Sequence, residues 1–117
     1  IDSIPTSANK EDHVSMGTIS ARKCRDITSN TEDVIAIELL SAAQALDLFT
    51  NMKPGEGTLA AYQAIRKTVS HLDKDRIIST DIAAVKQLMR SGKILRAVEK
   101  KVGALQYAIP VRIEKVP

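Results

Sequence analysis

The stretch from Val34 to Phe49 constrains the fold more than any other part of the sequence. Twelve of its sixteen residues are apolar, and the four that interrupt them are Glu38, Ser41, Gln44 and Asp47. A helix that is apolar nearly all round must be surrounded by protein or by lipid. A transmembrane helix needs about 20 apolar residues without such interruptions, so no membrane partner is expected.

This apolar stretch has few neighbours available in a chain of 117 residues. The sequence therefore predicts that it packs in a helical bundle against other subunits or against other parts of a longer protein. A central helix in a monomeric core is the alternative. The chain begins with Ile1, and its first methionine is Met16. We interpret it as a fragment of a longer protein.

The N-terminal part is expected to be helical over residues 10–50. Asn9 is a plausible N-cap, and the acids Glu11 and Asp12 suit the positive end of a helix. Ser29 and Glu32 have the spacing of a capping box. The box either starts a second helix or marks a kink in one long helix.

A second helical part is expected over residues 58–102, after a loop at 51–57 that is rich in proline and glycine. Thr58 is the expected N-cap of its first helix. Ser79 or Thr80 is the expected N-cap of a later one.

Two glycines punctuate the C-terminal end of this helical part. Ser91-Gly92 interrupts the helical spacing, and after Gly103 the apolar residues alternate with polar ones. Residues 103–117 are therefore predicted to form a short extended tail, which Pro110 restricts to a sheet edge or an unpaired segment. The predicted fold class is all-α, with long helices in a bundle.

Charge is distributed unevenly along the chain. Residues 1–50 contain four basic and eight acidic residues, whereas residues 51–117 contain thirteen basic and six acidic ones. The densest basic cluster has the spacing of one helical face and comprises Lys86, Arg90, Lys93, Arg96, Lys100 and Lys101. A solvated face is the ordinary interpretation. A phosphate-binding stripe is the alternative, but it lacks the residues that read bases, so no nucleic-acid partner is expected.

Other residue types restrict the chemistry. The one cysteine, Cys24, cannot form an internal disulfide, which favours a cytoplasmic protein. The two histidines, His13 and His71, lack metal-binding spacing, so no metal is expected. The successive side chains of Lys10, Glu11 and Asp12 could serve acid–base chemistry, although capping and solvation are the ordinary reading of such a run.

The segment DSIPTSANKEDHVSMG, residues 2–17, resembles the late active-site segment of the histidine ammonia-lyases, in the aromatic amino acid lyase family. The resemblance continues through Ala21-Arg22-Lys23 and through AIELLSAAQALD, residues 36–47. Weaker similarity at Asp75-Arg76 and Asp81-Ile82 extends it into the last third of the chain.

The resemblance implies the C-terminal part of an all-α lyase fold, with residues 1–9 approaching the active site and residues 10–50 in the core bundle. It implies a cytoplasmic homotetramer that eliminates ammonia from L-histidine to give trans-urocanate. The family's cofactor, 4-methylidene-imidazol-5-one, forms autocatalytically from an Ala-Ser-Gly tripeptide, which this chain does not contain. The fragment alone is therefore expected to be inactive, as a dimer or a tetramer.

Glu11 is the one active-site residue that the resemblance carries over, as a catalytic and substrate-binding residue. Relatives that act on phenylalanine or tyrosine usually have an amide at this place, whereas a carboxylate can pair with an imidazole or an ammonium group. Lys10 departs from the glutamine that is commoner in the family. Two alternatives stay open: a lyase or aminomutase of the same family with another aromatic amino acid as substrate, and a non-catalytic helical oligomerisation module.

Overall fold

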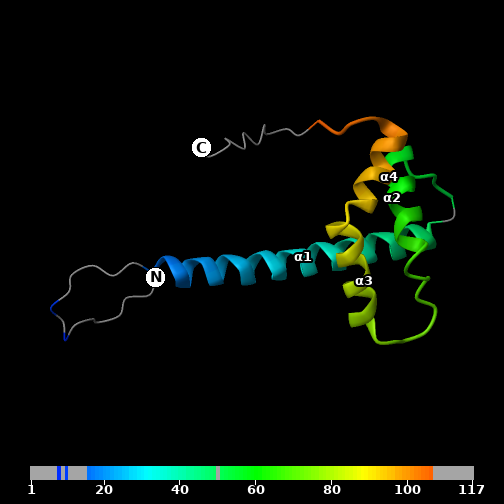
Figure 1. Cartoon of the computed structure of the whole chain (residues 1–117). Coiled ribbons are helices and arrows are strands. Elements are labelled where there is room, and N and C mark those ends of the chain that lie inside the picture. Colours follow the sequence, from blue (N-terminus) through cyan, green and yellow to red (C-terminus); the bar gives the residue numbers. More distant parts are fainter. Residues whose placement is uncertain (1–7, 9, 11–15, 50, 107–117) are drawn as a thin grey trace. The chain divides into compact units, whose positions relative to one another are not determined.

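A computed structural model describes residues 8, 10, 16–49 and 51–106. Within these ranges the chain is all-α and has no strand, as predicted. The helices, shown in Figure 1, are α1 (Gly17–Leu48), α2 (Glu56–Arg66), α3 (Ile78–Arg90) and α4 (Lys93–Val102). Most of the predicted extended tail, from residue 107 onward, lies outside the described residues. No helix of the described part is long and apolar enough to cross a membrane.

α1 is one continuous helix of 32 residues. The predicted capping box does not start a new helix, because Ser29 and Glu32 both lie inside α1. Inside a helix each backbone N–H already donates to a carbonyl one turn back. A capping side chain there finds no free N–H group to bind. The hydroxyl groups of Thr28 and Thr31 instead donate to the carbonyls of Cys24 and Ile27, at 2.9 Å in both cases.

The expected start of this helix is only partly described. Lys10 lies in a turn, and α1 begins at Gly17. The predicted N-cap, Asn9, lies outside the described residues, as do residues 11–15.

The chain divides into two compact units, residues 1–32 and residues 33–117. The second unit contains the end of α1 together with α2, α3 and α4, and its core is small. Ala36 and Ala43 of α1 are seven residues apart and therefore lie on the same helical face. They cluster with Ile65, Val69 and Val85, against which Leu39, Leu40, Tyr62, Ile82, Ala84, Met89 and Ile94 pack.

Only one face of the apolar Val34–Phe49 stretch is buried. Val34 is 63% exposed, Leu48 72% and Phe49 56%, whereas Ala36 is fully buried. A central helix in a monomeric core would bury the whole stretch. The monomeric-core alternative therefore accounts for the buried face of this stretch, but not for its exposed apolar residues.

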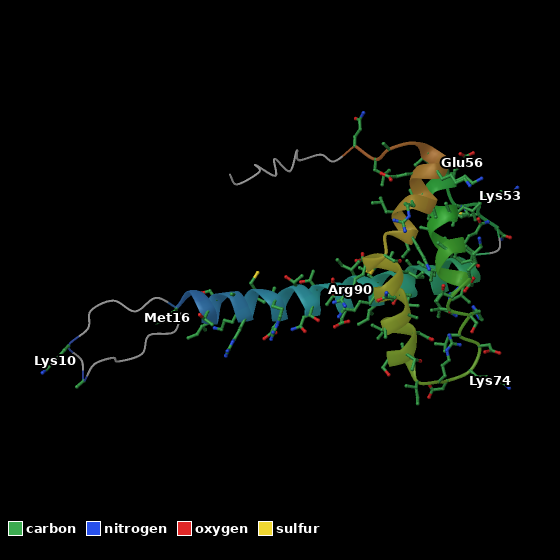
Figure 2. All side chains as sticks on the ribbon, viewed as in Figure 1. Lys10, Met16, Lys53, Glu56, Lys74 and Arg90 are labelled. Carbon is green, nitrogen blue, oxygen red and sulfur yellow. The ribbon has the colours of Figure 1, made fainter. Side chains whose placement is uncertain are left out.

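Both predicted caps after the loop lie one or two positions inside their helices. α2 starts at Glu56 with Gly55 as its N-cap, so Thr58 is in its first turn. Lys53 and Glu56, labelled in Figure 2, flank the proline and glycine that separate α1 from α2. Gly55 has extended backbone angles, and Glu56 places an acid at the positive helix end, so the helix begins without a hydroxyl cap.

α3 begins in a similar way. Ile77 is its N-cap, which places Ser79 and Thr80 within the first turn. The Thr80 hydroxyl donates to the Ile77 carbonyl at 2.9 Å rather than accepting from the helix N–H groups. Asp81 supplies the acid of the first turn.

The two glycine breaks are confirmed. α3 ends at Arg90, and Gly92 has a φ of +66°, in the left-handed region that glycine adopts without a steric penalty. α4 ends at Val102, and Gly103 has a φ of +82°. After the break at Gly92, α4 packs along α2.

The predicted basic face is divided by this break. Lys86 and Arg90 belong to α3, whereas the other four basic residues belong to α4, so a single helical face is the wrong description. Lys86 forms an ion pair of 2.7 Å with Asp33 of α1, and Arg96 Nη2 donates to the Ser91 carbonyl at 2.5 Å. Part of the cluster therefore stabilises the fold.

Candidate functional site

The predicted catalytic and substrate-binding residue, Glu11, lies outside the described residues, and so does His13. The second histidine, His71, is described. It belongs to the densest group of polar contacts in the second unit, which is centred on Asp47. We name this group the Asp47 centre; it comprises Gln44, Asp47, Tyr62, Arg66 and His71.

Asp47 sits in the last turn of α1 and receives three hydrogen bonds. The Tyr62 hydroxyl of α2 donates to Oδ1 at 2.5 Å. On Oδ2, Arg66 Nη2 donates at 2.6 Å and His71 Nδ1 lies at 2.8 Å. An ionised carboxylate can only accept, so the Nδ1 atom of His71 carries the proton in this contact.

The contacts hold Asp47 in its ionised form. Burial by itself raises the pKa of Asp47, but the hydrogen bonds from Tyr62, His71 and Arg66, with the positive charge of Arg66, outweigh burial and lower the pKa to about 2. The same hydrogen bond to Asp47, helped by desolvation, raises the pKa of the Tyr62 hydroxyl. Arg66 also lies over the Tyr62 ring, with its guanidinium carbon 5.9 Å from the ring centroid.

Gln44, one turn before Asp47, binds the backbone of the connector between α2 and α3. Its amide nitrogen donates to the Leu72 carbonyl, and its amide oxygen accepts from the Leu72 N–H, both at 3.1 Å. The amide oxygen also accepts from Arg66 Nη2 at 3.2 Å. The side-chain amide of Gln44 therefore satisfies both the N–H and the carbonyl of Leu72, as the backbone of a neighbouring β-strand would.

Two arginines complete the attachment of the connector, residues 67–77, in which Figure 2 labels Lys74. Arg66 Nη1 donates to the carbonyls of Val69 and Ser70 at 3.3 and 3.2 Å. Arg76 donates to the carbonyls of Ser70 and His71 at 2.9 and 3.0 Å, and its Nε atom donates to Asp81 at 2.9 Å. The connector has no helix, so these side chains satisfy backbone carbonyls that would otherwise need water.

A groove of about 530 Å³ opens beside the Asp47 centre. Its walls are mostly apolar and come from the second half of α1, from the connector and from the start of α3. Ile37 and Leu48 line it on the α1 side, and Ile78 and Ile82 line it on the α3 side. Arg66 also lines the groove, and its Nε atom is buried without a hydrogen-bond partner among the described residues.

The chemistry of the Asp47 centre is that of a structural ion-pair network. All three donors converge on a carboxylate with a depressed pKa, which makes it a poor proton acceptor near neutral pH. His71, whose side chain is 44% exposed, is the member most open to solvent. No group of three or more potential ligands that could hold a metal ion occurs among the described residues.

The Asp47 centre is not among the sites predicted from the sequence, although the sequence contains one signal of it. Gln44 and Asp47 are polar residues three positions apart in the mostly apolar stretch of residues 34–49. Residues at that spacing share a face, and a buried polar face needs partners. The identity of those partners is not encoded locally, because they come from residues 62–72.

The family model for aromatic amino acid lyases matches residues 1–67. This match spans more than half of the chain, and the chain belongs to the aromatic amino acid lyase family. Several curated relatives that it matches at about 50% identity are histidine ammonia-lyases. That of Natranaerobius thermophilus is 52% identical over 106 residues, or 91% of this chain and 21% of the relative. That of Gloeobacter violaceus is 53% identical over 105 residues, or 90% of this chain and 20% of the relative.

Two solved structures resemble the fold. Histidine ammonia-lyase from Trypanosoma cruzi matches with a TM-score of 0.74 and 36% identity, over 97% of this chain and 24% of that chain. Tyrosine aminomutase from Streptomyces globisporus matches with a TM-score of 0.72 and 37% identity, over 85% of this chain and 19% of that chain. The chain spans about one fifth of the length of the curated relatives it matches.

Proposed function

We propose that this chain is part of a histidine ammonia-lyase, an enzyme that eliminates ammonia from L-histidine to give trans-urocanate. The observation that supports the proposal most is the identity of about one half to histidine ammonia-lyases over some nine tenths of the chain. The test is to incubate the full-length protein with L-histidine and to follow the absorbance of urocanate. Absence of turnover in a folded, full-length protein would overturn the proposal.

The cofactor proposed for the full-length enzyme, 4-methylidene-imidazol-5-one, cannot form from the residues of this chain. It forms from Ala-Ser-Gly in this family, and the sequence has no such tripeptide. Once formed, the group would supply the electrophile. The 117-residue chain alone is therefore expected to produce no urocanate, and mass spectrometry is expected to find it unmodified.

We assign to Glu11 a role in substrate binding and catalysis. Either a carboxylate removes the weakly acidic proton next to the imidazole, or it anchors the positive groups of the substrate. In the full-length enzyme, Glu11→Gln keeps the shape and removes the charge. We expect kcat to fall at least about 10²-fold, because a general base contributes about 10²–10⁴-fold.

The kinetic constants separate the two roles of Glu11. If the carboxylate only anchors the substrate equally in the ground and transition states, KM rises and kcat stays constant. Glu38→Gln is the matched control, because Glu38 is an exposed carboxylate on α1 outside the active-site segment, residues 2–17. Near-normal kcat and kcat/KM in Glu11→Gln would remove Glu11 from the active site.

A second candidate is an enzyme of the same family that acts on another aromatic amino acid, including an aminomutase. The similarity to tyrosine aminomutase, at 37% identity, favours it. Parallel assays of the full-length protein with L-tyrosine and L-phenylalanine distinguish the candidates. A higher kcat/KM for either of them than for L-histidine would favour the second candidate.

We also propose that the protein is a cytoplasmic homo-oligomer, a tetramer in its full-length form. Val34, Leu48 and Phe49 support this proposal because they expose large apolar side chains in a stretch, residues 34–49, that has only four polar residues. A non-catalytic oligomerisation module would share this surface. It would differ in showing no turnover with any aromatic amino acid in the full-length protein.

A further inference from the structure

We draw no further inference here: the strongest candidate, the apolar groove between the second half of α1, the connector after α2 and the start of α3, carries nothing because nothing in the structure shows what covers it.

Discussion

At the scale of single residues, Asp47 joins α1 to the elements that follow it. Its side chain is 13% exposed and that of Arg66 14%, so their 2.6 Å ion pair is mostly removed from water. The pair differs from the Arg25–Asp26 contact, whose side chains are 77% and 64% exposed. Solvent screens exposed pairs, and such pairs contribute little to stability.

Replacing Asp47 by Asn is expected to lower the free energy of unfolding by about 3 kcal/mol, because it leaves the Arg66 charge without its counter-ion. Urea denaturation of the 117-residue chain, followed by circular dichroism, measures the change. The matched control is Asp26→Asn, which is expected to cost less than about 1 kcal/mol. Equal effects of the two substitutions would contradict a structural role for the Asp47 centre.

The same carboxylate makes stability depend on pH. Its pKa is lowered from 3.8 to about 2 in the folded chain, so between these values the folded state binds fewer protons than the unfolded state. The contribution is therefore complete above pH 4 and is lost as the pH falls toward 2. It amounts to about 2 kcal/mol at most.

The test compares the pH dependence of unfolding in the wild type and in Asp47→Asn. The wild-type free energy of unfolding is expected to fall more steeply between pH 4 and pH 2, so that the two curves converge. Parallel curves over this interval would show that the pKa of Asp47 is unchanged by folding.

At the scale of elements, the break between α3 and α4 depends on one glycine. Gly92 has a φ of +66°, which side-chain-bearing residues rarely adopt. A Cβ atom at this position would also lie 3.0 Å from Nη1 of Arg96. Gly55, by contrast, has a φ of −60° and no atom within 4 Å of the place of its Cβ. The two glycines therefore form a matched pair for substitution.

Gly92→Ala is expected to destabilise the chain by about 1–2 kcal/mol through the left-handed backbone. Gly55→Ala is expected to be neutral or slightly stabilising, because alanine restricts the unfolded chain. Thermal unfolding of both variants measures the difference. A Gly92→Ala variant as stable as Gly55→Ala would show that the break does not need the left-handed conformation.

At the scale of the whole molecule, the exposed apolar face of α1 predicts self-association. Burial of apolar surface contributes about 25 cal/mol per Å², so this face favours a partner over water. Ile37 is 47% exposed and Val34 63%, which allows a charge at either position without disturbing the core. Leu40 is unsuitable for the same test because it packs against the core.

Val34→Lys combined with Ile37→Lys is expected to shift the 117-residue chain from an oligomer to a monomer at micromolar concentration. Sedimentation velocity measures the shift, and circular dichroism checks that the helices remain. The control is Ile77→Lys, because Ile77 is 74% exposed and lies outside the apolar stretch. A compact, stable wild-type monomer would contradict the predicted assembly.

Local signals in the sequence determined much of this fold. The helical spacing of apolar residues predicted an all-α chain, and Gly92 and Gly103 marked the ends of helices, because periodicity and left-handed glycines act within a few residues. The exact caps were less predictable. At Ile77 the helix begins without a side-chain cap, so a hydroxyl nearby did not identify the start.

The Asp47 centre was decided by tertiary structure. Its members come from α1, α2 and the connector, and their hydrogen-bonded partners lie up to 28 positions away in the sequence. Sequence alone shows that Gln44 and Asp47 interrupt an apolar stretch, but not which groups form hydrogen bonds with them. Which face of that helix is buried was decided in the same way, because Ala36 and Ala43 are buried in a cluster with Ile65, Val69 and Val85, which come from later parts of the chain.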